Sequence, residues 1–128
     1  MKVESYKDLI IWQKSMELVE EIYKLTKLFP KNELYGLAQQ MQRAAVSIPS
    51  NIAEGYKRNH LPEYIQFLSI ANGSGAELET QLELCKRLPE LKKLSQIKAA
   101  GLLEEVMKMF TVIINKLKTK RYNLHATP

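Results

Sequence analysis

The sequence predicts an all-α protein: an up-down-up-down four-helix bundle in one domain that spans residues 1–128. Apolar residues recur at spacings of three and four along four long segments, as they do on the buried side of an amphipathic helix. Glycine and proline are scarce, at five residues each, which disfavours a turn-rich β fold. Four such helices with short connections pack most simply as antiparallel neighbours.

The first two helices are predicted at about residues 6–28 and 33–57. The first carries two adjacent apolar stripes, one with Trp12, Met16, Val19, Tyr23 and Thr26, the other with Ile11, Leu18, Ile22, Leu25 and Phe29. It ends before Pro30, because the residue before a proline avoids the α region. Asn32 is the predicted N-cap of the second helix, and Glu33 lies in its favourable first turn.

The third and fourth helices are predicted at about residues 62–88 and 96–119. Pro62 suits a first helical turn, and Ser95 is the predicted N-cap of the fourth helix. Residues 120–128 lack periodicity, so we expect a frayed tail. Cys85, the single cysteine, falls on an apolar stripe and is interpreted as a small core residue.

Several features of the chain indicate a cytoplasmic protein without a membrane segment. The longest apolar run near the N-terminus, residues 9–12, is too short for a signal-peptide core. No stretch approaches the roughly 20 apolar residues that a membrane-spanning helix needs. A single cysteine excludes an internal disulfide, which fits a reducing compartment.

Pro49 lies inside the second predicted helix. A proline there removes one backbone hydrogen bond and costs about 3 kcal/mol. The apolar series nevertheless continues past it through Ile52 and Ala53. We therefore expect one long helix kinked at Pro49 rather than two helices.

Polar side chains follow one face of the same helix, in steps of four, four and three from Arg43. One interpretation is a solvent-exposed face. The other is a partly buried network that sets the pairing of the second and third helices, with Gly73 and Gly75 allowing close approach. The residues of this predicted structural network are Arg43, Ser47, Asn51, Glu54 and Glu77.

Several motifs together resemble a known family. They are LIIWQK at 9–14, FP at 29–30, SIPSNIAEG at 47–55 and GSGAE at 73–77, with Glu33, Gln40, Arg43 and Ala44 between them. Over residues 6–118 the chain is similar to the bacterial 23S rRNA intervening-sequence proteins, which are four-helix bundles. Each motif is weak alone, and the fourth helix matches mainly in pattern.

This resemblance implies a homopentamer and no enzymatic activity. Some members of the family are encoded within insertions in the large ribosomal RNA gene. The fold is shared with an accessory protein of diversity-generating retroelements, which binds nucleic acid and a reverse transcriptase. For most members the biochemical role is not established.

The net charge of +5 is unevenly distributed. Residues 90–128 carry eight basic and three acidic residues, whereas residues 59–89 carry two basic and four acidic ones. This excess suits either an anionic polymer or a merely solvated lysine surface. The candidate nucleic-acid-binding residues, which would neutralise phosphates, are Lys57, Arg58, Lys92, Lys93, Lys98, Lys116, Lys118, Lys120 and Arg121.

The wide apolar face of the first helix indicates a subunit interface, with Ile10, Ile11 and Leu18 as candidate exposed residues. Trp12 and Tyr23 are expected in the core, which leaves Tyr56, beside two cations, as the better base-stacking candidate.

The first functional hypothesis is a non-catalytic, homo-oligomeric protein that binds structured RNA or DNA through phosphates. The second is a protein-interaction scaffold, such as an accessory subunit of a reverse transcriptase or RNA-processing enzyme. An enzyme is the third and is disfavoured, because His60 and His125 are the only histidines and no nucleotide-loop or metal motif occurs. No metal and no cofactor are expected.

Overall fold

The structure is a computed structural model that describes residues 2–33 and 36–126, and within them it contains helices and no β-strand. The long helices are α1 (Ile10–Thr26), α2 (Leu37–Lys57), α3 (Leu61–Arg87) and α4 (Ile97–Ala126). Two short 3-10 helices, η1 (Tyr6–Asp8) and η2 (Lys31–Glu33), precede α1 and α2. The prediction of an all-α fold with four long helices is confirmed.

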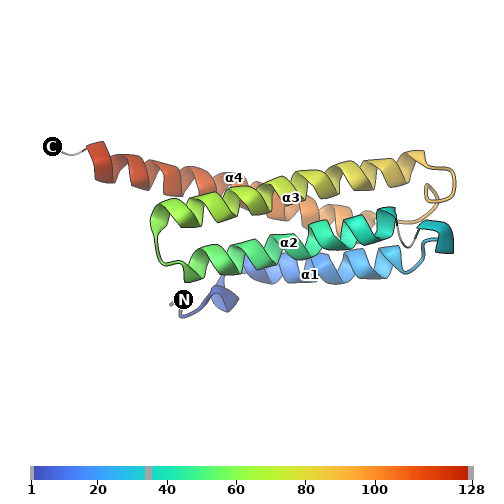
Figure 1. Cartoon of the computed structure of the whole chain (residues 1–128), viewed down its shortest axis with the longest axis horizontal. Helices are drawn as coiled ribbons and strands as arrows, with labels where there is room; N and C mark the ends of the chain where they lie inside the picture. Colours follow the sequence, from blue (N-terminus) through green and yellow to red (C-terminus); the bar gives the residue numbers. More distant parts are fainter. Residues whose placement is uncertain (1, 34–35, 127–128) are drawn as a thin grey trace.

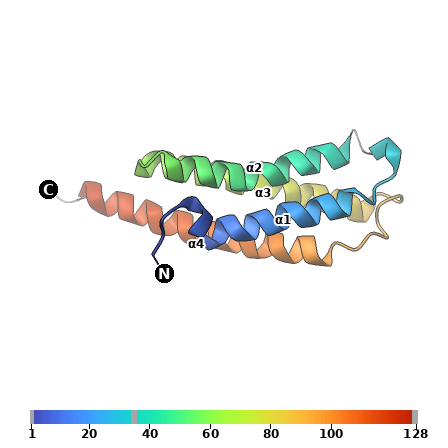
Figure 2. The same ribbon diagram turned by 90° about the horizontal axis from the view of Figure 1, so that it is seen from below.

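The four helices lie along one common long axis, and successive helices run in opposite directions in Figures 1 and 2. Each helix packs on two others: α2 and α4 both contact α1 and α3, and α2 and α3 share the most extensive contact. This pattern is consistent with a bundle. We call the end with residues 58–60 and the last turns of α4 the turn end, and the end with residues 27–33 and 88–96 the loop end.

The core follows the second of the two apolar stripes of α1. Ile11 is 2% exposed and Leu18 is fully buried, so the expectation that they are surplus surface residues is wrong, whereas Ile10 is 60% exposed. Positions seven apart share a helix face, and this face points at the bundle centre. The surplus apolar surface of α1 lies instead on the other stripe, at Met16 and Tyr23, so the expectation that Tyr23 lies in the core is wrong.

Two predicted helix starts are shifted in the structure. Asn32 belongs to η2, and α2 begins only at Leu37 with Gly36 as its N-cap residue. Ser5 caps the short η1 in a capping box with Asp8, so α1 starts at Ile10 and not near Tyr6. In both places a separate 3-10 turn occupies the residues where the sequence pattern placed the start of the long helix.

The frayed tail expected from Lys120 is not seen, because α4 continues helically to Ala126. No glycine or proline occurs between Leu102 and Thr127, and lysine, arginine and leucine are good helix formers. The helix therefore extends beyond the region where neighbours pack on it. Across the described residues, no helix has both the length and the apolar character that a membrane crossing requires.

Pro49 lies within α2, which runs unbroken from Leu37 to Lys57, so the expectation of one helix rather than two is confirmed. The proline ring is buried. Burial of an apolar ring offsets part of the cost of the missing backbone hydrogen bond. The kink at this position stays a prediction.

Gly55 and Gly75 permit close packing around α3, but with different partners. A Cβ at Gly55 would lie 2.7 Å from the Phe67 Cβ, so this residue lets α2 approach α3 near the turn end. A Cβ at Gly75 would meet the Met107 thioether on α4. Gly73 has no atom within 4 Å of such a Cβ, so packing within this chain does not explain it.

Candidate nucleic-acid interface

The candidate basic residues divide between the two ends of the bundle. The turn end holds six of them: Lys57, Arg58, Lys116, Lys118, Lys120 and Arg121. The loop end holds Lys92, Lys93 and Lys98. Between the ends lies α3, whose 27 residues span about 40 Å at 1.5 Å per residue. The residues therefore form two separate surfaces.

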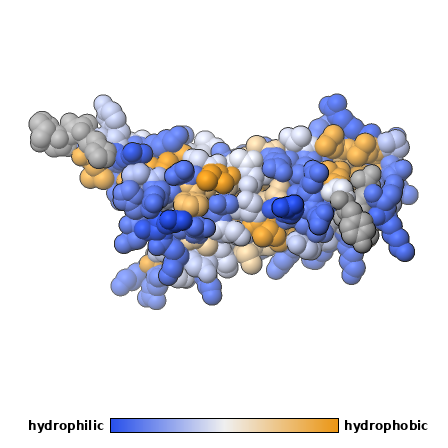
Figure 3. Space-filling view, in the orientation of Figure 1, coloured by the Kyte–Doolittle hydropathy of each residue, from blue (hydrophilic) through white to orange (hydrophobic). Residues whose placement is uncertain are grey.

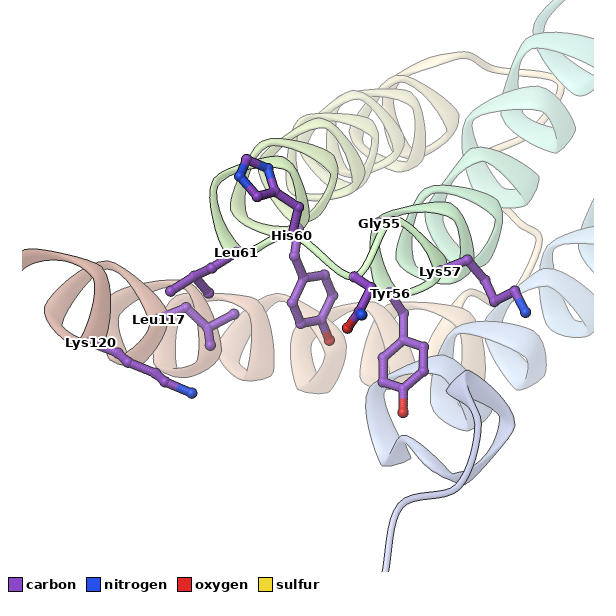
Figure 4. A pocket seen from close by; sticks show the side chains of 9 residues that line it. Gly55, Tyr56, Lys57, His60, Leu61, Leu117 and Lys120 are labelled. Atoms are coloured by element: carbon purple, nitrogen blue, oxygen red, sulfur yellow. The ribbon is translucent and has the colours of Figure 1, made fainter. Parts of the chain in front are cut away.

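A cavity of about 460 Å³ opens at the turn end, where α2, α3 and α4 meet (Figure 4). It is lined by Tyr56 and Lys57 from α2, residues 59–60 of the turn, Leu61 and Tyr64 from α3, and Leu117 and Lys120 from α4. Among the candidate cations, Lys57 and Lys120 share this cavity although they lie far apart in the sequence. The cavity thus joins the basic end of α4 to the last turn of α2, which includes Gly55, the final residue of the SIPSNIAEG motif.

The backbone of the α2–α3 turn shapes one wall of this cavity. Asn59 has φ 52°, in the left-handed region that asparagine enters more readily than most residues. This conformation reverses the chain within three residues, after which Pro62 occupies the first turn of α3. Gly55 then lets Tyr64 lie close to α2, with 3.2 Å from its Cδ1 to the position of a Cβ at Gly55.

Two tyrosines form the aromatic part of the cavity. The rings of Tyr56 and Tyr64 meet edge to face, with centroids 6.1 Å apart and planes at 84°. This geometry covers only one face of one ring, so the pair itself leaves the other faces available. Burial raises the pKa of Tyr64, and the nearby Tyr56 raises it further by a smaller amount. The Tyr64 hydroxyl is therefore protonated at neutral pH and can donate a hydrogen bond.

The cations at the cavity differ in how they are paired. Throughout the described part of the chain, no carboxylate lies within ion-pair distance of Lys57 or Lys120. Arg58 is held by Glu54, with 2.8 Å from Nη2 to Oε2, and lies 5.1 Å from the centroid of the Phe67 ring. The hydrogen bond to Glu54 also raises the pKa of Arg58. Arg58 is thus the weakest phosphate candidate at this end.

Beyond Leu117, α4 projects past the α2–α3 turn (Figure 1). Lys118, Lys120 and Arg121 are exposed on this projection, Lys116 is exposed directly before it, and within the described residues none of the four forms an ion pair. Tyr122 is 72% exposed and Leu124 is 65% exposed. The projection therefore presents exposed, unpaired cations around a helix that the rest of the chain does not cover.

The predicted structural network is only partly assembled. Asn51 Nδ2 donates to the Ser47 carbonyl oxygen at 2.8 Å and to Ser47 Oγ at 2.9 Å. Ser47 Oγ lies 2.8 Å from Ser74 Oγ and links α2 to α3. Glu54 instead pairs with Arg58, and Glu77 accepts a 3.4 Å hydrogen bond from Gln81. Arg43 is exposed at the groove between α1 and α2.

Tyr64, Leu117 and residues 59–60 were not among the residues predicted from the sequence. Tyr64 follows Tyr56 by eight positions across the turn, and only the reversal at Asn59 brings the two rings together. Within the described residues, no group of three or more histidine, cysteine, aspartate or glutamate side chains is placed to hold a metal ion.

Comparison with known proteins identifies the family. The search of curated proteins finds no match. The family model described as 23S rRNA-intervening sequence protein matches residues 7–112. This range includes α1, α2, α3 and the first half of α4, and it ends before Leu117 and Lys120. The match covers more than half of the chain, and the protein therefore belongs to the 23S rRNA-intervening sequence protein family.

Proposed function

We propose that this protein is a non-catalytic, homo-oligomeric nucleic-acid-binding protein that holds structured RNA, such as ribosomal RNA, through phosphate contacts at the turn end. One observation carries the proposal: five cations without an acidic partner gather there within the described residues, namely Lys57, Lys116, Lys118, Lys120 and Arg121. The family description, which names an rRNA intervening sequence, supports the same polymer.

Such contacts fix affinity rather than sequence preference. Each lysine that neutralises a phosphate releases condensed counterions, so the affinity falls steeply as salt rises. Phosphates carry no base identity, and the exposed lysines on α4 are free to rotate onto any backbone. The protein is thus suited to recognise the shape and charge of an RNA rather than its sequence.

Self-association belongs to the same proposal, with a homopentamer as the expected state. The apolar surface that supports it is the groove between α1 and α2, a cavity of about 480 Å³ lined in part by Tyr23 and Val46. These residues are 47% and 40% exposed, and Met16 on the same stripe of α1 is 39% exposed. Five copies of a chain with net charge +5 carry a total charge of about +25, which strengthens attraction to RNA.

A gel-shift titration of rRNA fragments over a series of salt concentrations tests RNA binding. We expect the logarithm of the association constant to fall linearly with the logarithm of the salt concentration. The slope should be about −0.7 to −0.9 for each phosphate contact. Absence of a shift at the lowest salt contradicts the proposal. Light scattering of the same sample tests self-association, and a mass that equals one chain contradicts that part.

The loop end favours a second candidate function, an interaction scaffold for a protein such as a reverse transcriptase or an RNA-processing enzyme. Leu28 is 65% exposed and Ile97 is 82% exposed, and both line a cavity of about 370 Å³. Large exposed aliphatic side chains around a groove are typical of protein contacts. A pull-down that retains one protein after nuclease treatment supports this function, and loss of that protein contradicts it.

A further inference from the structure

We propose that the turn-end cavity receives one unpaired nucleotide of the bound RNA, with its base against the ring of Tyr56 and its phosphates between Lys57 and Lys120. This inference rests on the proposed function, and it narrows the ligand from nucleic acid in general to strands that offer an unpaired base.

The size and lining of the cavity fit a nucleotide. Its volume of about 460 Å³ lies within the range of about 300–1,000 Å³ that is typical of small-molecule sites. Tyr56 projects from the last turn of α2, and Leu61 and Leu117, which lie together near Lys120 in Figure 4, contribute aliphatic surface on the other side of the cavity. An aromatic face next to aliphatic side chains is the environment in which unpaired bases stack.

The charges around the cavity fit the backbone of the same nucleotide. Lys57 and Lys120 lie on opposite sides of Tyr56 in Figure 4, and Lys120 belongs to the projecting part of α4. Neither is paired with a carboxylate in the described residues, so a phosphate displaces no internal ion pair. Arg58, which is already bound to Glu54, stays outside this role.

Polar groups that can contact the base or ribose also line the cavity. The protonated Tyr64 hydroxyl and the side chain of Asn59 offer donors and acceptors. A base inside a duplex is paired and stacked between neighbours, and it reaches such a cavity only after it is extruded. The arrangement therefore predicts a preference for single-stranded regions, loops and bulges.

The test compares a short, labelled, unstructured RNA strand with the duplex that it forms with its complement, by fluorescence anisotropy near physiological ionic strength. Tyr56→Leu removes the π face but keeps apolar volume, and Tyr56→Phe restores the ring. Leu84→Ala is the control, because Leu84 is an exposed apolar residue near the end of α3 that lies away from the cavity. Circular dichroism confirms that each variant is folded.

We expect Tyr56→Leu to lower single-strand affinity at least about fivefold, since stacking on an aromatic ring contributes about 1–3 kcal/mol per base. Duplex affinity should change little, and Tyr56→Phe and Leu84→Ala should both retain the single-strand affinity. In the NMR spectrum of the wild-type protein, the ring resonances of Tyr56 should shift on addition of the strand.

The outcomes separate this inference from the proposed function. Equal loss of strand and duplex binding in Tyr56→Leu, or no loss at all, overturns the nucleotide site and leaves phosphate binding intact. Failure of the wild-type protein to bind either RNA overturns the proposed function. Binding of AMP as tight as that of the strand assigns the cavity to a free nucleotide and overturns the strand contact.

Discussion

The two ends of the bundle carry similar charges in different surroundings. At the turn end, unpaired lysines surround a cavity with two tyrosines and a projecting helix. At the loop end, Lys92, Lys93 and Lys98 accompany the exposed aliphatic residues Leu28 and Ile97. The face shown in Figure 3 is mostly hydrophilic, with apolar residues scattered in small patches.

This difference shows that a count of lysines does not identify a ligand. A phosphate needs only a cation, whereas a nucleotide also needs a flat apolar surface and hydrogen-bonding groups beside that cation. Both ends satisfy the first requirement, and the turn end also satisfies the second. Exposed aliphatic side chains such as those at the loop end are better suited to contact with another protein.

The largest expected effect comes from removing charge at one end at a time. The triple variant with glutamine at Lys116, Lys118 and Lys120 should bind single-stranded RNA about 100-fold more weakly near 0.1 M salt. Each lost phosphate contact reduces the slope of log affinity against log salt by about 0.7, so three contacts account for about two powers of ten relative to 1 M salt. Salt-dependent anisotropy measures both the affinity and this slope.

The control removes the same number of charges at the loop end, in Lys92, Lys93 and Lys98→Gln. The ends are about 40 Å apart, which exceeds the Debye length of about 10 Å at 0.1 M salt. Little change is therefore expected. Equal losses in the two triple variants would show that RNA contacts both ends and that the turn end has no special role.

The second-largest expected effect is a change in stability caused by altered helix packing at the turn end. Gly55→Val should lower the free energy of unfolding by about 2 kcal/mol, because a Cβ there meets the Phe67 Cβ at 2.7 Å and overpacks the α2–α3 contact. Urea denaturation monitored by circular dichroism gives the change in midpoint and slope.

Gly73→Ala is the matched glycine variant and should act in the opposite direction. Nothing lies within 4 Å of a Cβ at Gly73, so alanine should stabilise the helix by about 0.5–1 kcal/mol. If Gly73→Ala also destabilises the protein or reduces its mass in light scattering, Gly73 lies in a contact between copies of the chain.

The smallest effect is a pH dependence at the turn end. Because burial raises the pKa of Tyr64 above its ordinary value of 10.0, the unfolded chain releases this proton at a lower pH than the folded one. The stabilisation that this pKa difference gives the folded protein is fully present below the unfolded value of 10.0, and it is lost as the pH rises through the folded-state pKa.

Tyr64→Phe removes the titrating hydroxyl and should make the alkaline fall in unfolding free energy shallower. When the titration is followed by tyrosinate absorbance, this variant should lack the transition that occurs at the highest pH. Identical alkaline slopes for the variant and the wild-type protein would show that Tyr64 is as solvated when folded as when unfolded.

Much of the fold could be read from the sequence because it depends on local periodicity. The spacing of apolar residues predicts the four helices, including the continuation of α2 through Pro49 to Ile52 and beyond. The choice between two adjacent stripes on α1 could not be read in the same way. Both have helical spacing, and only packing on α2 and α4 buries Ile11 and Leu18 and leaves Met16 and Tyr23 exposed.

The candidate site was likewise predicted in part: its residues could be chosen from the sequence, but their arrangement could not. Residue type and charge pattern were enough to select Lys57, Lys120 and Tyr56 one by one, since each property belongs to a single side chain. Their meeting in one cavity with Tyr64 and Leu117 depends on the left-handed turn at Asn59 and on the antiparallel return of α4. Distances between residues about 60 positions apart are set by how the helices pack, and no local pattern encodes them.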